Sequence, residues 1–290
     1  MATSHIQELS KNSLYALQNV FELNGLASSY PANARGYSVV NCYLLKQDDG
    51  ALLLDSGYTV HADSILTQIG GLLDTKTPLS IYPLRLNEFM SVCNVEAIAG
   101  TFHVDQCYSS NPDAALWVDF GGRSDSVNPQ PYLLKTTVVS RAQKIYVGSG
   151  DQRLLEAFQA PIRLIATRWI YDQVTKTLFT SDSFTHEWRD QEDGPWITNA
   201  TTNQTSAQYV KSFLLNTRYW WLRGGDTGSL RKKLADIFEK YDIENIAPGY
   251  GCVIQGKELV KQQYQLLDEA LRDFDKSQIT PYYMDRDEVR

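Results

Sequence analysis

Histidine, the side chain that most often binds metals and transfers protons near neutral pH, is scarce in this sequence. The 290 residues contain four histidines, no two within five positions of each other: His5, His61, His103 and His186. The four cysteines also stand apart, without a CxxC pair: Cys42, Cys93, Cys107 and Cys252. This spacing predicts neither a zinc site nor a disulfide framework, and it favours free, mostly buried thiols.

Motifs of nucleophilic and nucleotide-dependent enzymes are also missing. The sequence has no GxSxG elbow, no Walker loop and no GxGxxG fingerprint after a strand. Cys93 has no histidine near it in the sequence, so a thiol nucleophile finds little support.

Composition and charge narrow the class of protein. Hydrophobic residues make up 43% and charged residues 21%, as in ordinary globular chains. The net charge of −7 argues against nonspecific electrostatic binding to nucleic acid or to anionic lipid. No run approaches the roughly 18 to 20 apolar residues of a membrane span, and the first residues lack the pattern of a secretory signal. We therefore expect a soluble, cytoplasmic protein with no nucleic-acid or membrane partner.

The elements that would position any site begin with a hairpin. Tyr37–Leu45 and Ala51–Leu54 are β-rich runs joined by the turn-like QDDG, and the second run ends in Asp55-Ser56-Gly57. A helix on a sheet should follow, because apolar residues then recur at helical spacing: Ile65, Leu66, Ile69, Leu72 and Leu73.

The rest of the chain alternates between short strands and helices. We expect further strands at Tyr132–Val139, Lys144–Val147, Ile162–Thr167, Thr177–Thr180 and Ile243–Ala247. We expect helices capped by Ser206 and Ser229, and a last helix over Lys257–Phe274. This order predicts an α/β fold in one domain, residues 1–290, with about the first 30 and the last 15 residues peripheral.

Four segments, in this order, resemble the metallo-β-lactamase fold, in particular the diiron domain of flavodiiron proteins. ARGYSVVNCYLL with ALLLDSG resembles its opening hairpin and LDTG-type loop. TRWIYD at Thr167–Asp172 is similar to the HWPD segment, LFTSDSF at Leu178–Phe184 to LFSxDAF, and IAPGYG at Ile246–Gly251 to IAPSHG. The resemblance covers roughly Arg35 to Gly256 and implies a four-layer αββα sandwich.

The first metal-binding motif of that family, HxExDH, is largely replaced here. RLNEFMS at Arg85–Ser91 places Leu86 and Ser91 at the two histidines and Met90 at the aspartate. Glu88 alone matches a ligand.

The remaining ligand positions are replaced in part. Arg168 stands at the HWPD histidine, Asp182 matches the bridging aspartate, and Tyr250 replaces the last histidine. Iron or zinc needs about four to six donors, and only two carboxylates remain. The comparison with the family therefore implies a chain without a metal centre and without a cofactor.

Two carboxylates left together without a cation would repel each other. We hypothesise that the guanidinium of Arg168 pairs with Glu88, with Asp182 or with both, and takes the electrostatic place of the metals. Arg85 is a second candidate for this role. A purely structural salt bridge is an equally open interpretation.

The candidate catalytic residues are Arg168, Tyr250 and His186. The Tyr250 phenol could act as an acid or orient a ligand, although filling volume also explains it. His186 is the histidine that falls next to a motif and could transfer protons, although an exposed loop position is also common. The candidate ligand-binding residues are Arg85, Glu88, Asp182 and Trp169.

Three hypotheses about the function follow from these residues and from the resemblance. The first is a small-ligand-binding or regulatory protein that has lost its dinuclear site. The second is an enzyme that uses the former metal cavity without metal. The third is a residual flavodiiron-like oxidoreductase or metal-dependent hydrolase with non-standard ligands. The resemblance also implies a homodimer.

Overall fold

The computed structural model describes residues 3–85, 88–110, 136–139 and 144–277. The chain folds into two compact units, and segments of the two units alternate along the sequence. Unit 1 comprises Met1–Val20, Val40–Gln159 and Ile165–Thr175, and unit 2 comprises Phe21–Val39, Ala160–Leu164 and Lys176–Arg290. That the whole chain forms one domain stays a prediction.

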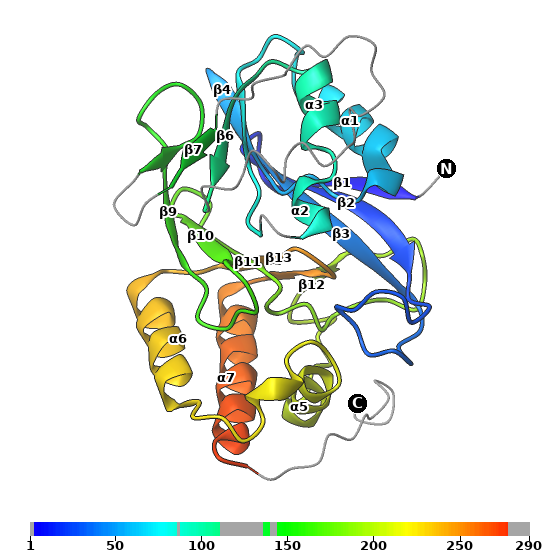
Figure 1. The fold of residues 1–290 in the computed structure, drawn as a ribbon, viewed down its shortest axis with the longest axis vertical. Helices are drawn as coiled ribbons and strands as arrows, with labels where there is room; N and C mark the ends of the chain where they lie inside the picture. Colours follow the sequence, from blue (N-terminus) through cyan, green and yellow to red (C-terminus); the bar gives the residue numbers. More distant parts are fainter. Residues whose placement is uncertain (1–2, 86–87, 111–135, 140–143, 278–290) are drawn as a thin grey trace. The chain divides into compact units, whose positions relative to one another are not determined.

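A seven-stranded sheet, in the order β1-β2-β3-β4-β5-β6-β7, forms most of unit 1 (Figure 1). Its strands are β1 (Ser4–Ser10), β2 (Leu14–Glu22), β3 (Tyr37–Gln47), β4 (Gly50–Leu54), β5 (Leu79–Tyr82), β6 (Val104–Ser109) and β7 (Thr136–Val138). The predicted hairpin is confirmed, since β3 and β4 pair antiparallel from Tyr43↔Leu54 to Gln47↔Gly50. β4, β5, β6 and β7 then run parallel, so their carboxyl ends lie at one edge.

Helices cover one face of this sheet. They are α1 (Ala62–Gly70), preceded by the 3₁₀ turn η1 (Thr59–His61), and α3 (Val95–Thr101). The short helix α2 (Phe89–Val92) bonds instead to the loop after β4, through Met90 and Gly57. Ile65 and Ile69 of α1 and Ile98 of α3 are buried in one apolar cluster with strand residues such as Leu44, Leu53 and Ile81. The predicted helix after the Asp55 loop is therefore confirmed, although it ends at Gly70, before Leu72 and Leu73.

Unit 1 also holds β8 (Ile145–Tyr146), β9 (Leu154–Gln159) and β10 (Arg168–Asp172), in the order β8-β9-β10. The predicted strand at Ile162–Thr167 is wrong, because the chain is irregular there and β10 begins one residue later. The predicted strand at Lys144–Val147 is confirmed as β8. Part of the predicted strand Tyr132–Val139 is seen as β7, and residues 132–135 lie outside the described residues.

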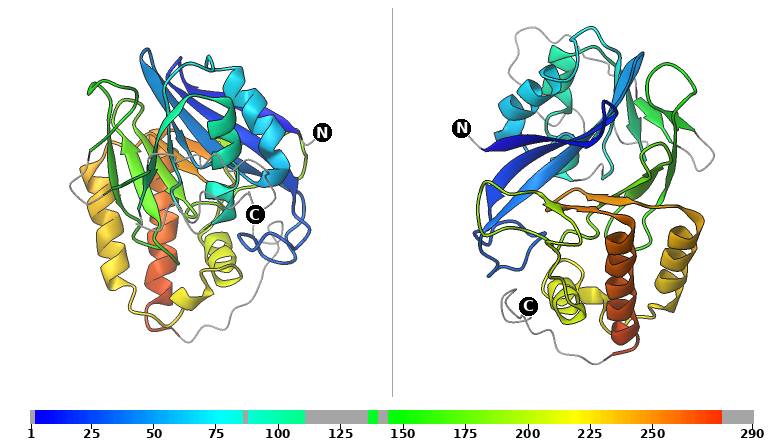
Figure 2. Two further views of the ribbon diagram at one scale, coloured as in Figure 1. Left: turned by 45° about the horizontal axis from the view of Figure 1, so that its top comes forward. Right: turned by 180° about the vertical axis from the view of Figure 1, so that it is seen from behind.

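Unit 2 has four strands in the order β12-β14-β13-β11, with three helices packed beside them (Figure 1). The strands are β11 (Thr177–Ser181), β12 (Ile197–Thr198), β13 (Asn245–Pro248) and β14 (Val253–Gln255). The helices are α5 (Ala207–Leu215), α6 (Gly228–Lys240) and α7 (Lys257–Phe274), and a 3₁₀ turn, η3 (Trp220–Leu222), follows α5. α6 and α7 lie side by side, as Figure 2 shows from behind.

The helix boundaries test the predicted caps. The Ser206 hydroxyl accepts a hydrogen bond from the Tyr209 N–H at 3.2 Å, and α7 spans the predicted residues, so both predictions are confirmed. The predicted cap at Ser229 is wrong, because α6 begins at Gly228 after Thr227. Among the described residues, no helix is long and apolar enough to cross a membrane.

Candidate functional site

The loop after β4 fixes the segment that carries Glu88. Asp55, in the left-handed region at φ 61°, accepts the Leu84 N–H at 2.8 Å through its carboxylate. Gly57 has φ 77° and donates its N–H to the Met90 carbonyl at 2.7 Å. A Cβ at Gly57 would lie 2.3 Å from Ile65, so this position requires glycine. The DSG turn therefore holds Leu84 and Met90 beside the end of β4.

Glu88 has an arginine partner within this segment. The Arg85 Nη1 lies 3.5 Å from the Glu88 carboxylate, and the Arg85 side chain is fully buried whereas that of Glu88 is 26% exposed. Met90 and Ser91 are buried next to them. The second candidate cation of the sequence analysis, Arg85, thus pairs with Glu88. Leu86 lies outside the described residues.

Arg168 begins β10 and is only half-buried. Its backbone N–H donates to the Leu84 carbonyl at 3.1 Å, next to an antiparallel bridge between Arg85 and Thr167. Its guanidinium forms no hydrogen bond or ion pair with the residues that the structure describes. The hypothesis that Arg168 pairs with Glu88 or Asp182 is therefore not supported by a contact between described residues.

Tyr82, the last residue of β5, is fully buried near Arg168. Within the described part of the chain, its hydroxyl has no hydrogen-bond partner. Burial raises the pKa of Tyr82, while the charge of Arg168 lowers it and that of Asp55 raises it. The phenol therefore stays protonated at neutral pH, within electrostatic reach of the Arg168 guanidinium.

Trp169 is the neighbour of Arg168 on β10, and its side chain is completely buried. Its ring packs edge-on against Phe158 of β9, with the centroids 6.5 Å apart. This packing contributes to the core of unit 1. The predicted role of Trp169 in ligand binding stays a prediction.

Unit 2 contains the second retained carboxylate. Asp182 is 4% exposed, and its Oδ1 lies 3.4 Å from Nη1 of Arg218, whose side chain is 13% exposed. Arg218 also donates to the hydroxyls of Ser28 and Ser29 at 2.9 and 3.0 Å. No sequence motif indicates this arginine, which lies 36 residues from its partner.

The backbone on either side of Asp182 has unusual conformations. Ser181 and Phe184 have φ values of 52° and 63°, a region that residues other than glycine seldom enter. Hydrogen bonds maintain this turn: the Gly249 N–H donates to the Ser181 carbonyl at 2.7 Å, and the Thr180 hydroxyl donates to the Ser183 carbonyl at 2.9 Å. Such conformations cluster at functional sites, because elsewhere their cost is not retained.

His186 is buried instead of lying at an exposed loop position. One of its ring nitrogens, Nε2, is 2.9 Å from the Gln263 Oε1, and its ring packs edge-on against Tyr209 and Phe213. Burial lowers the pKa of His186, so its ring is neutral at pH 7. Asp182 and His186 line one small cavity of about 20 Å³, room for about one water molecule.

Tyr250 follows β13 and is 1% exposed. Its ring packs edge-on against Phe21, with the centroids 6.4 Å apart. The backbone directly after it is fixed, since the Gly251 N–H donates to the Val39 carbonyl at 3.0 Å. The volume-filling interpretation of Tyr250 accounts for these contacts, and a catalytic role stays a prediction.

The donor set does not fit a dinuclear iron or zinc centre. In the described ranges 3–85, 88–110, 136–139 and 144–277, no group of three or more His, Cys, Asp or Glu side chains could hold a metal ion. Glu88 and Asp182 are each within ion-pair distance of an arginine, which competes with a cation for the same oxygens. Met90, Arg168 and Tyr250 stand where the family resemblance puts other ligands.

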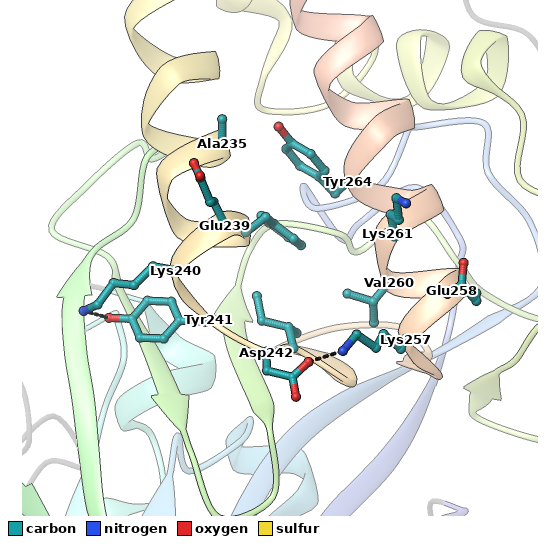
Figure 3. A pocket seen from close by; sticks show the side chains of 12 residues that line it. Ala235, Glu239, Lys240, Tyr241, Asp242, Lys257, Glu258, Val260, Lys261 and Tyr264 are labelled. Atoms are coloured by element: carbon teal, nitrogen blue, oxygen red, sulfur yellow. Dashed lines mark hydrogen bonds and ion pairs between the residues drawn. The ribbon is translucent and has the colours of Figure 1, made fainter.

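A larger cleft, of about 670 Å³, opens between α6 and α7 (Figure 3). Its lining includes the stacked rings of Phe238 and Tyr264, 4.5 Å apart. Three lysines and three acids face it, so its charge is balanced: Lys240, Lys257, Lys261, Glu239, Asp242 and Glu258. None of the predicted site residues lines this cleft, and its balanced charge selects neither anions nor cations.

Comparisons with known proteins identify the fold. No protein-family model matches the sequence, and no curated protein matches it. Solved structures do match, among them the rubredoxin oxygen:oxidoreductase from Desulfovibrio gigas, with a TM-score of 0.69 at 14% identity over 93% of this chain and 62% of that one. A flavoprotein from Thermotoga maritima gives 0.63 at 14% identity, over 93% and 61% of the two chains.

The flavodiiron protein from Giardia intestinalis is similar as well, with a TM-score of 0.61 at 14% identity over 92% of this chain and 59% of that one. The present chain thus spans about three fifths of the length of these structures. Identities this low carry the fold and nothing more. The chain has the α/β, metallo-β-lactamase-like fold of the flavodiiron core, as the sequence predicts.

Proposed function

We propose that this chain works without a dinuclear metal centre, as a small-ligand-binding or regulatory protein built on the metallo-β-lactamase-like fold. One observation carries the proposal. The two carboxylates that match family ligands, Glu88 and Asp182, each have an arginine beside them, Arg85 and Arg218. In each pair the guanidinium supplies a fixed positive charge beside the carboxylate, so no cation is needed for charge balance.

The free-energy cost of burying these ion pairs supports a role in function as well as in stability. Taking an arginine and a carboxylate out of water costs several kcal/mol per ion, and apolar residues of the same volume are often as stable. Arg85 and Asp182 are almost completely buried. The strained turn at Ser181 and Phe184 adds a further cost beside Asp182.

Metal analysis tests the proposal directly. The full chain would be purified from medium supplemented with iron and zinc, and its metal content measured by mass spectrometry. We expect well under one metal ion per chain. About two ions per chain, lost together in Glu88→Gln and Asp182→Asn variants, would contradict the proposal.

A catalytic role without metal is the alternative outcome. Incubating the protein with any ligand that raises its melting temperature, and following that ligand by NMR, separates the two. A ligand that stays chemically unchanged supports a binding protein. Turnover that disappears in Tyr250→Phe or His186→Gln would instead support an enzyme.

The expected homodimer is a separate part of the proposal and rests on the resemblance. Light scattering of the purified chain tests it, and a monomer mass at all concentrations would contradict it.

A further inference from the structure

We infer that Arg168 and Tyr82 form a binding site for an oxyanion, the carboxylate or phosphate group of a small molecule. This inference rests on the proposed function and names the class of ligand. All residues that carry it belong to unit 1.

The backbone brings Tyr82 and Arg168 close together. The bond between the Arg168 N–H and the Leu84 carbonyl, with the bridge between Arg85 and Thr167, sets residue 168 opposite residue 84. Tyr82 is two residues before Leu84. Because β5 ends at Tyr82, the segment that bonds to Arg168 directly follows Tyr82, and the two residues lie on neighbouring backbone segments. The effect of the Arg168 charge on the pKa of Tyr82 agrees with this placement.

Both groups can donate hydrogen bonds that no described residue accepts. The Tyr82 hydroxyl is buried and has no hydrogen-bond partner among the described residues, which is costly unless something else accepts its proton. The Arg168 guanidinium carries five N–H donors and makes no hydrogen bond or ion pair with the residues that the structure describes.

The neighbouring acceptor is engaged elsewhere. Asp55 is the carboxylate whose charge acts on Tyr82, and its Oδ1 accepts the Leu84 N–H. Glu88 has the Arg85 guanidinium beside it. An incoming group with several acceptor oxygens would satisfy the phenol and the guanidinium together, and carboxylates and phosphates match the planar fork of arginine.

The position suits a ligand site. Tyr82 and Asp55 stand at the carboxyl ends of β5 and β4, which are parallel neighbours. Open α/β sheets bind ligands outside this edge. The buried phenol would then fix orientation, and the half-buried arginine would supply charge.

Titration calorimetry and thermal shift with inorganic phosphate and with malonate test the inference, against sodium chloride at equal ionic strength. We expect one or both anions to raise the melting temperature, and the stronger of the two to identify the ligand group. Arg168→Gln should weaken binding by at least about tenfold, and Tyr82→Phe by a smaller factor. Arg168→Lys, which keeps the charge and loses the fork, should lie between the wild type and Arg168→Gln.

Lys261→Gln is the matched control, because it removes one positive charge from the α6–α7 cleft. Its affinity should equal that of the wild type. Anions that give no more than the chloride effect, or that bind Arg168→Gln and wild type equally, would overturn the inference. Neither result touches the metal analysis, so the proposed function and this inference can fail separately.

Discussion

Two arginines of unit 1, Arg153 and Arg168, show opposite ways of placing a cation in one fold. Arg153 is completely buried and pairs with the buried carboxylate of Asp172. It also donates to the Ser13 carbonyl at 3.0 Å and the Lys46 carbonyl at 3.2 Å. Asp172 in turn accepts the Thr175 hydroxyl at 2.6 Å. This network satisfies its members and is structural.

Arg168 differs from Arg153 in burial and in partners. It is half-buried, and within the described residues its guanidinium has no acceptor. The Tyr82 hydroxyl near it likewise has no hydrogen-bond partner in the described part of the chain. A buried arginine whose side-chain nitrogens all have acceptors, such as Arg153, stabilises the fold. An arginine beside a buried donor without an acceptor among the described residues, such as Arg168, is instead placed to bind a ligand.

The largest loss of stability is expected when Arg153, the structural arginine of the two, loses its carboxylate partner. Asp172→Ala leaves the Arg153 charge buried and unpaired, so it should lower the free energy of unfolding by about 3–5 kcal/mol. Urea denaturation of the variant and the wild type measures this. A loss below about 1 kcal/mol would mean that water reaches Arg153.

Arg218→Ala should have an intermediate effect. Asp182 would keep its burial and lose this partner, but Arg218 is partly exposed, so the expected loss is about 2–3 kcal/mol. Ser28→Ala with Ser29→Ala is the control, since it removes two hydrogen bonds of Arg218 and keeps the ion pair. If that double variant loses as much as Arg218→Ala, the ion pair contributes little.

Lowering the pH should destabilise the protein, because its buried histidines must take up protons. The expected loss of stability is smaller than that caused by the two substitutions above. Burial lowers the pKa of His186 below its ordinary value of 6.5, so the unfolded chain takes up the proton first as the pH falls. Stability from this residue is complete above about pH 7 and declines below pH 6.5, down to the folded pKa.

Denaturation midpoints at about pH 7 and pH 5 measure the slope, and His186→Gln should reduce it. His61, whose pKa is also lowered by burial, remains in that variant and preserves part of the slope. An unchanged slope in His186→Gln would show that His186 does not contribute.

The smallest change in stability is expected at Arg168, and it is the most direct test of the difference between Arg168 and Arg153. Arg168→Ala should change the free energy of unfolding by no more than about 0.5 kcal/mol, because no ion pair with a described residue is lost. Urea denaturation without added anion measures it. A loss as large as that of Asp172→Ala would make Arg168 a structural residue, like Arg153.

Local patterns allowed part of the fold to be predicted. The β3–β4 hairpin, the cap at Ser206 and the whole of α7 depend on turn residues, caps and periodicity within a short window. β2 lacks such a pattern, because both of its faces are buried. The side-chain amides of its polar residues Gln18 and Asn19 donate to Asn41 and Gln68, far away in the sequence.

The candidate site shows the same limit. Glu88 and Asp182 could be found because they match motifs, and Arg85 because it stands three residues from Glu88. Arg218 and Tyr82 could not, since an ion pair separated by 36 residues and a hydroxyl that no described residue accepts leave no trace in local spacing. Which arginine forms an ion pair with which carboxylate depends on tertiary contacts.

The alternation of the two units along the sequence has a consequence for biosynthesis. Residues 21–39 belong to the same unit as residues 176–290, so their partners are made more than a hundred residues later. During translation this early segment must wait for its partners until the residues from 176 onward have been made. Such delayed pairing slows folding and makes the nascent chain a client for chaperones.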